Sequence, residues 1–258
     1  MKYLLILSCL LFTSVGWSKT IDADDLIEKD GLYYEKFTEK PFTGKVTGAK
    51  QGKIKKGKIK GKWIEYWESG TLKKSFTIKK GHYNGQYTEY YENGNLMWKG
   101  NHKEGTEEGE WLKYYENGQL DYKVNYIYLY GREGEYLKYY ENGQLKQKGN
   151  YKDDLKEGEW LYYYENGQLG IKSNYKFGKE EGEYLEYYEN GKLNKKDNYN
   201  YGNKHGEQLT YWDNGQLGIK SNYKHGKEEG EWLYYKKNGQ LKKTDIYKDD
   251  KFIETITP

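Results

Sequence analysis

The stretch Gly158-Glu-Trp-Leu-Tyr-Tyr-Tyr-Glu-Asn-Gly-Gln-Leu169, followed by Tyr175, decides the fold, because the chain repeats it eight times with small changes. Successive copies are 24 residues apart, except for one step of 25. A period this short is typical of a stacked array of small units that bury apolar surface only against their neighbours. We therefore expect one elongated body that acts through its surface. The turn glycines are Gly70, Gly94, Gly118, Gly143, Gly167, Gly191, Gly215 and Gly239.

The composition fits a thin array held together by aromatic rings. The 258 residues include 32 Tyr and 8 Trp, charged residues make up 32%, and only two prolines occur. Each aromatic side chain can bury about 150–250 Å² while its polar tip stays in water. Few prolines suit a continuous strand ladder, because proline cannot donate a ladder hydrogen bond. The net charge of +3 is small, and nucleic acid is not among the expected partners.

The first 18 residues have the pattern of a secretory signal peptide. Lys2 gives a positive start, residues 4–15 are apolar, and the small residues Gly16 and Ser18 precede a cleavage site. We expect cleavage between Ser18 and Lys19, so that the mature protein is exported to the periplasm, the cell envelope or the medium. An N-terminal strand or buried helix is the alternative.

Cys9 is the only cysteine in the chain. Ile6-Leu-Ser-Cys9 is similar to a lipobox and would anchor a lipoprotein, but it would leave a signal of only eight residues. If cleavage follows Ser18 instead, the mature chain has neither a thiol nor a disulfide. Packing and hydrogen bonds must then hold the fold alone.

Each copy is predicted to be a β-hairpin with its corner at Asn-Gly. Asn166-Gly167 lies between two aromatic segments, which is the strongest short hairpin signal. A two-residue type I′ turn needs positive φ at both residues, and Asn and Gly tolerate it. The residues from Tyr175 to Gly182 are rich in Gly and Lys, and we expect them to be a loop to the next hairpin.

This turn would assign the side chains to two faces. With positions counted from the opening glycine (Gly158 is 0), +6 lies opposite +11 and +3 lies opposite +14. Positions +2, +6, +11 and +17 then share a packing and interaction face, whereas a bulge would exchange the faces. Stacking of the rings on neighbouring hairpins is the alternative to binding a partner. The candidate interaction residues are Trp63, Trp67, Trp111, Tyr115, Trp160, Tyr164, Tyr188, Trp212 and Trp232.

The predicted fold class is all-β, an elongated single-layer antiparallel meander or solenoid of about eight hairpins. At about 4.8 Å per strand, sixteen strands would extend roughly 75 Å, and the strands should twist. We divide the chain into a signal peptide (1–18), a degenerate N-terminal cap with a lysine-rich lead-in (19–60), eight repeats (61–250) and a C-terminal tail (251–258).

A run of eight lysines without an acid precedes the repeats. Such a run can attract an anionic polymer or a lipid surface. A solvated strand edge, where lysine discourages aggregation, is the alternative. The candidate patch consists of Lys45, Lys50, Lys53, Lys55, Lys56, Lys58, Lys60 and Lys62.

The repeat unit resembles the bacterial MORN-repeat variant family over about residues 61–250. Asp30-Gly-Leu-Tyr-Tyr-Glu-Lys36 and Lys40-Pro-Phe-Thr-Gly-Lys-Val46 look like the N-terminal cap of such proteins, and Gln51-Gly-Lys-Ile54 looks like a shortened Asn-Gly-Gln-Leu. The resemblance implies an all-β meander that interacts with proteins or membranes rather than catalysing a reaction. Relatives are often labelled as antitoxin components. With an export signal, the compatible version is an immunity or inhibitor role outside the cytoplasm.

Residues for catalysis or metal binding do not form a recognisable pattern. Gly52–Lys58 matches half of a phosphate loop, but Ile59 stands where Ser or Thr should hold magnesium. We expect no enzyme activity and no cofactor. The histidines occupy different repeat positions without metal-ligand spacing: His82, His102, His205 and His225.

Three functions remain open. The first is an exported, non-catalytic scaffold that binds a protein partner, or a second copy of itself, through aromatic side chains. The second is a glycan-binding module of the envelope with aromatic cages, although the recurring lysine at +14 argues against it. The third is attachment to an anionic membrane surface through the lysine run, which would be weak and sensitive to salt.

Overall fold

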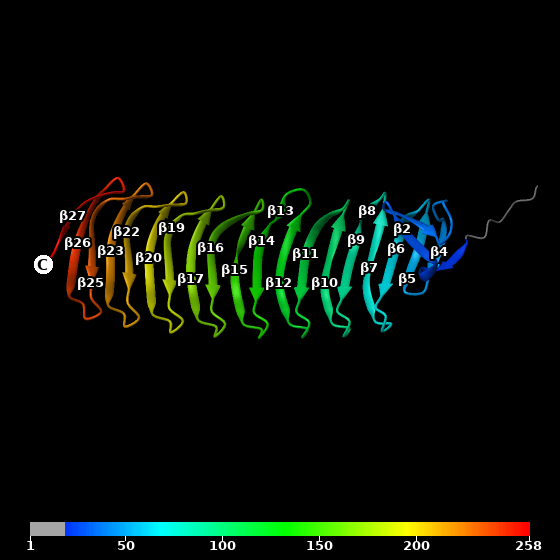
Figure 1. Ribbon diagram of the computed structural model, residues 1–258, viewed down its shortest axis with the longest axis horizontal. Coiled ribbons are helices and arrows are strands. Elements are labelled where there is room, and N and C mark those ends of the chain that lie inside the picture. The colour runs from blue at the N-terminus through cyan, green and yellow to red at the C-terminus, as the bar shows by residue number, and fades with distance from the viewer. Residues whose placement is uncertain (1–18) are drawn as a thin grey trace, which may run out of the picture.

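The computed structural model describes residues 19–258, which form an elongated, open, single-layer β-sheet (Figure 1). The expected signal peptide, with Ser18 and Cys9, lies outside the described residues. The predicted all-β class and the meander of eight hairpins are confirmed. One sheet contains 25 strands, and β2 and β3 form a separate two-stranded sheet. Within residues 19–258, no helix is long and apolar enough to cross a membrane.

The element bounds follow the repeat. The N-terminal end contains β1 (Thr20–Asp22), the 3-10 helix η1 (Ala23–Asp25), β2 (Leu26–Lys29), β3 (Leu32–Glu35), β4 (Gly44–Thr47) and β5 (Lys50–Lys55). The repeats contribute the long strands β6 (Lys58–Tyr66), β7 (Leu72–Lys79), β9 (Gly85–Tyr90), β10 (Leu96–Lys103), β11 (Thr106–Tyr114), β12 (Leu120–Ile127), β14 (Gly134–Tyr139), β15 (Leu145–Lys152), β16 (Leu155–Tyr163), β17 (Leu169–Lys176), β19 (Gly182–Tyr187), β20 (Leu193–Asn200), β22 (Gly206–Tyr211), β23 (Leu217–Lys224), β25 (Gly230–Tyr235) and β26 (Leu241–Lys248). The links contain the short strands β8 (His82–Tyr83), β13 (Gly131–Arg132), β18 (Lys179–Glu180), β21 (Asn203–Lys204) and β24 (Lys227–Glu228), and the sheet ends at β27 (Lys251–Ile256).

The Asn-Gly corners reverse the chain, but not through the predicted turn. At Asn166-Gly167 only the glycine has positive φ, 83°. The Gly167 N–H donates to the Tyr164 carbonyl oxygen at 2.9 Å, and the Tyr164 N–H donates to the Gln168 carbonyl oxygen at 2.8 Å. This pattern fits a three-residue loop, in which a type I turn precedes a glycine bulge. The type I′ prediction is wrong here, because Asn166 keeps negative φ while its Oδ1 accepts a hydrogen bond from the Gln168 N–H.

A second irregularity, at the unpaired Gly170, changes the register beside the corner. Leu161 (+3) lies opposite Lys172 (+14), as predicted, but Tyr163 (+5) rather than +6 lies opposite Leu169 (+11). Position +11 therefore shares a face with +3, +5, +14 and +16, which we call the ion-pair face. Positions +2, +4, +13, +15 and +17 form the opposite face, which we call the aromatic face. The prediction that +11 joins +2, +6 and +17 is wrong.

The links between hairpins, predicted as loops, are tight two-residue turns, except for the link with the inserted residue, where three residues separate the paired Ile127 and Gly131. Phe177 (φ 52°) and Gly178 (φ 76°) lie between the paired residues Lys176 and Lys179. Positive φ at both central residues is what a type I′ turn requires. The sheet therefore continues through the links without a break. Paired positive φ values also occur at Lys80-Gly81, Glu104-Gly105, Asp153-Asp154, Tyr201-Gly202, His225-Gly226 and Asp249-Asp250.

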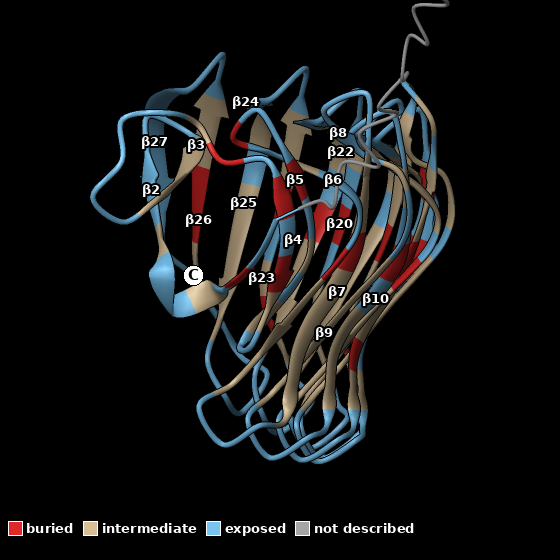
Figure 2. Ribbon diagram, turned by 90° about the vertical axis from the view of Figure 1, so that its right-hand side faces the viewer, coloured by how far each residue is buried: buried red, intermediate tan, exposed pale blue. Residues whose placement is uncertain are grey.

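On the aromatic face, the size of the ring at +2 is related to the size of the residue at +15 on the preceding strand. Trp111 and Trp160 are buried, and each lies over a glycine of the preceding repeat, Gly100 or Gly149. A Cβ at either glycine would lie 2.2 Å from the tryptophan ring. The larger Val124 occupies this position before a repeat with tyrosine at +2. Figure 2 shows that the strands bend and that buried residues lie near their middle.

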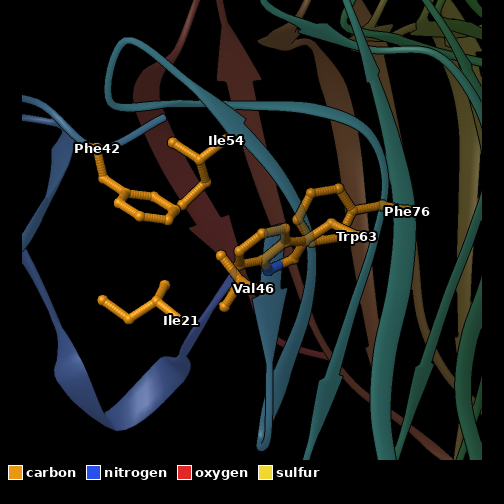
Figure 3. Packing of buried hydrophobic residues seen from close by; sticks show 6 residues of the cluster. All are labelled: Ile21, Phe42, Val46, Ile54, Trp63 and Phe76. Atoms are coloured by element: carbon orange, nitrogen blue, oxygen red, sulfur yellow. The ribbon is translucent and has the colours of Figure 1, made fainter. Parts of the chain in front are cut away.

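The two ends of the sheet differ. At the N-terminal end β1 pairs in parallel with β4, and an apolar cluster covers the edge (Figure 3). At the other end, residues 251–256, expected to be a tail, form β27 against β26 and are all exposed. The N-terminal cluster consists of Ile21, Phe42, Val46, Ile54, Trp63 and Phe76.

Candidate interaction surfaces

The structure divides the predicted interaction residues into two groups. Trp63, Trp111, Trp160 and Trp232 occupy position +2 on the aromatic face, and the first three are buried. Trp67, Tyr115, Tyr164, Tyr188 and Trp212 occupy position +6 at the Asn-Gly corners. The first group therefore lies within the strands and the second at their corner ends.

The residues at +6 join each repeat to the next. The Tyr164 hydroxyl donates to the carbonyl oxygen of Tyr187, position +5 of the following repeat, at 2.7 Å. Beside it, Asn166 Nδ2 donates to the Glu189 carbonyl oxygen at 3.1 Å. We call the series of +6 bonds the corner ladder. Its other donors are Trp67, Tyr91, Tyr115, Tyr140, Tyr188 and Trp212, the two tryptophans through their indole N–H.

The edge formed by the links is also cross-connected. Glu157 Oε2 accepts a hydrogen bond from the Phe177 N–H of the following link at 3.0 Å. Glu181 does the same for Tyr201 at 2.8 Å. These glutamates in the links therefore stabilise the neighbouring turn.

The ion-pair face is balanced in charge through most of the array. Lys172 Nζ at +14 lies 2.6 Å from Glu159 Oε2 at +1. Ion pairs this exposed contribute about 0–1 kcal/mol each, and their alternation leaves no surface of one sign. The same pairing occurs in Lys123–Glu110, Lys148–Glu135, Lys196–Glu183 and Lys220–Glu207.

The lysine run breaks this balance at the N-terminal end. Lys45 lies opposite Lys53, which lies opposite Lys60, and Lys55 lies opposite Lys58. With Lys62, which lies opposite Thr77, these residues place six ammonium groups on the ion-pair face of β4, β5 and β6. Within residues 19–258, none of the six has a carboxylate within 4.0 Å.

Two of the eight predicted patch residues lie elsewhere. Lys50 pairs with Glu65 in the strand register, and its Nζ lies 6.0 Å from the centre of the Tyr33 ring. Lys56 lies in the turn between β5 and β6 with φ 49°. The patch on one face therefore contains six lysines rather than eight.

The aromatic face is hollowed where the second and third repeats meet. A cavity of about 330 Å³ is lined by rings between Tyr83 and Tyr126 and by the carboxylates of Glu89 and Glu107. We call it the aromatic hollow. Its lining rings include Tyr87 stacked on Trp111 at 6.0 Å, and Trp98 nearly perpendicular to Tyr122 at 5.5 Å.

The aromatic hollow has an acidic character. The Tyr87 hydroxyl donates to Glu89 Oε2 at 2.8 Å, and burial together with this bond raises the pKa of Tyr87. Burial lowers the pKa of His102, so its ring is neutral at pH 7. In the described part of the chain, neither Glu89 nor Glu107 has a cation within ion-pair distance. Two carboxylates therefore face rings without a neutralising charge.

Of the residues that line the hollow, the predicted interaction residues contain only Trp111. Trp98 and Tyr122 occupy position +13, which varies between repeats. An aromatic residue at this position in two successive repeats is the sequence signal that could have identified the hollow. The structure also brings two scattered histidines together, because the rings of His205 and His225 lie 5.2 Å apart on neighbouring links. Among residues 19–258, no three His, Cys, Asp or Glu side chains converge to hold a metal ion.

Comparison with known proteins places the repeats in a family. The chain matches the family described as MORN repeat variant. No curated protein matches it. A chain of the solved structure of TcdB2-TccC3 is 14% identical over 76% of this chain with a TM-score of 0.23, and one of TcdB2-TccC3-Cdc42 is 13% identical over 78% with a TM-score of 0.19. This chain spans 14% of the length of each of them. The family matches cover residues 59–80, 83–104, 107–128, 132–153, 156–177, 180–201, 204–225 and 228–249.

Proposed function

Because the chain belongs to the MORN repeat variant family, a repeat scaffold, we propose that it is an exported, non-catalytic scaffold that binds a protein partner on its aromatic face. An antitoxin or immunity-type role is the version of this proposal in which the partner is a toxin. Export after cleavage between Ser18 and Lys19 is part of the proposal, and the mass of the chain purified from the envelope fraction tests it.

One observation supports the aromatic face over the ion-pair face. Rings on this face that surround the open hollow are half-buried, as Tyr87 at +2, Trp98 and Tyr122 at +13 and Tyr126 at +17 are. Tyr and Trp are favoured at protein interfaces, because a rigid ring contributes a large contact area. Beyond the lysine patch, the ion-pair face instead carries charges that neutralise one another.

The repeats supply substitutions that test this choice. Tyr122→Gln removes a ring from the aromatic face, and Gln147 at the same repeat position shows that the strand accepts glutamine. Lys148→Ser is the matched control on the ion-pair face, where Ser75 occupies the same position. In affinity capture with cross-linking from the envelope fraction, we expect Tyr122→Gln to lose the partner and Lys148→Ser to keep it. If Tyr122→Gln keeps the partner and Lys148→Ser loses it, the binding site lies on the ion-pair face and the proposal is wrong.

The lysine patch supports a second function, attachment to an anionic surface. Six lysines without a nearby acid are a local basic field, which attracts anionic lipids and is screened by salt. We expect sedimentation with anionic vesicles at low salt and release at high salt. Lys53→Glu with Lys60→Glu should abolish sedimentation, whereas Lys148→Ser should not. Equal sedimentation of all three proteins would exclude this function for the patch.

A further inference from the structure

The chain fills some of its own aromatic sites with cations. Lys156, at position +22 in a link, holds its Nζ 4.6 Å from the centre of the Trp160 ring and 4.8 Å from that of Tyr175. It also donates to the Tyr162 hydroxyl at 2.6 Å. Trp160 and Tyr175 occupy positions +2 and +17 of the following repeat. A cation over aromatic faces is attracted by the negative charge of their π-systems.

Two other links repeat this arrangement. The Arg132 guanidinium lies 3.9 Å from the centre of the Tyr151 ring. Lys204 Nζ lies 5.1 Å from that of Tyr223. In each case the cation lies two residues before the opening glycine of the following repeat, and the ring is at +17 of that repeat. This place is +22 for Lys204, and it is +23 for Arg132 because of the 25-residue step. The space between +22 and the next +17 ring is therefore a place where this fold binds ammonium and guanidinium groups.

At the aromatic hollow the rings are present and the cation is replaced by an acid. Trp111 and Tyr126 occupy the positions of Trp160 and Tyr175, but position +22 is Glu107. All three line the open cavity. A carboxylate therefore points to a site that accommodates a positive charge in three other repeats.

The cations of the chain beside the hollow are held by other acids. Arg132 lies opposite Tyr126 in the strand register, but its guanidinium bonds Asp154 and lies over the Tyr151 ring. Lys113 Nζ forms an ion pair with Asp121 at 3.0 Å, and it lies 5.6 Å from the centre of the Trp98 ring and 5.9 Å from that of Tyr122. Lys113 is not among the residues that line the cavity. Glu107 and the rings of Trp111 and Tyr126 are thus left for a cation from outside.

We propose that the aromatic hollow binds the cationic head group of a lysine or arginine side chain of the protein partner, over Trp111 and Tyr126 and beside Glu107. The proposal rests on the proposed function and states the chemistry of the partner. The internal occupants of the equivalent sites are lysine and arginine, which favours a side chain of this kind. Lysine and arginine also donate N–H hydrogen bonds to a carboxylate, whereas a quaternary ammonium group has no N–H to donate.

The probes are N-acetyl-lysine amide and N-acetyl-arginine amide, added to the full mature chain. The indole N–H signals of Trp98 and Trp111 in nitrogen-15 NMR spectra report occupation of the hollow. We expect saturable shifts with both probes. N-acetyl-norleucine amide, which has a similar chain without the charge, should bind about tenfold more weakly or not at all. Equal binding of the norleucine probe, or binding of tetramethylammonium but neither amino acid probe, would overturn the proposal.

Glu107→Lys is the decisive variant, because it places a cation of the chain in the hollow. This cation would lie over Trp111 and Tyr126 as Lys156 lies over Trp160 and Tyr175. We expect it to fold, since lysine occupies +22 in two other repeats, and to lose the probe-induced shifts. Glu180→Lys changes another +22 acid outside the hollow and should bind the probes as the parent chain does. Unchanged probe binding by Glu107→Lys would refute the site.

The two proposals can fail separately. If Glu107→Lys still captures the envelope partner while Tyr122→Gln does not, the aromatic face binds a partner but the partner's cation does not enter the hollow. If neither variant changes capture while the probes bind the hollow, the hollow is a cation site but the proposed function is wrong. Loss of both capture and probe binding in Glu107→Lys, with both kept in Glu180→Lys, supports the two together.

Discussion

Removing one hydroxyl from the corner ladder should destabilise the array without changing its packing. Tyr164→Phe deletes the donor to the Tyr187 carbonyl oxygen, 2.7 Å away, and keeps the ring. A hydrogen bond of this kind contributes about 1 kcal/mol net to the free energy of unfolding. We therefore expect Tyr164→Phe to lower that free energy by about 1 kcal/mol.

The repetition of the bond allows the effect to be amplified. Successive tyrosines of the ladder are two long strands apart, which is about 10 Å, and changes at that distance are usually additive. Replacing all five by phenylalanine should therefore cost about 5 kcal/mol, comparable to the whole stability of many domains. The five are Tyr91, Tyr115, Tyr140, Tyr164 and Tyr188.

Urea unfolding followed by circular dichroism measures these changes. Tyr163→Phe is the matched control, because its hydroxyl is adjacent in sequence but donates no hydrogen bond to any of residues 19–258. The control should unfold as the parent chain does. If Tyr164→Phe is as stable as Tyr163→Phe, and the fivefold variant is as stable as the parent, the ladder does not hold the repeats together.

Three further outcomes follow from the packing and the charges. Gly149→Ala should lower the free energy of unfolding by about 1–3 kcal/mol in urea titrations, because its Cβ would meet the Trp160 ring. Burial raises the pKa of Tyr136 to about 12; the folded chain then keeps a proton that the unfolded chain loses near pH 10. The stability from this tyrosine is complete below about pH 10 and falls as the pH rises towards 12, which urea midpoints and tyrosinate absorbance can follow. Glu159→Gln removes the exposed ion pair with Lys172 and should cost less than about 1 kcal/mol, with the difference vanishing at high salt.

The hairpin array could be predicted because its signals are local. The glycine at each corner requires positive φ, and the regular distance between corners specifies strands of equal length. The turn type could not be predicted, because Asn-Gly suits both a two-residue type I′ turn and a type I turn with a glycine bulge. In the structure, the bulged corner allows the Asn166 amide and the Tyr164 hydroxyl to bond the next repeat. Those bonds form only when separate hairpins lie side by side, so the sequence of one hairpin does not indicate which turn it will adopt.

The aromatic hollow could not be predicted for a related reason. It combines +13 of one repeat, +22 in the link and +2 and +17 of the next, as in Trp98, Glu107, Trp111 and Tyr126. Their proximity follows from strand pairing across the link, which we expected to be a loop. Once the link is recognised as a turn within the sheet, the acid at +22 and the rings around it become visible as one site.

Under the proposed function, the residues at +22 give the array a capacity to change partners during evolution. This position, with its equivalent Arg132 in the repeat of 25 residues, carries either an acid or a base: Glu107, Arg132, Lys156, Glu180, Lys204 and Glu228. A single codon change at this position reverses the charge of one repeat and leaves the residues of the hairpin unchanged. Duplication or deletion of one repeat in the gene would move the charges beyond it by about 10 Å relative to those before it. Descendants of this chain could therefore acquire new binding specificities without having to acquire a new fold.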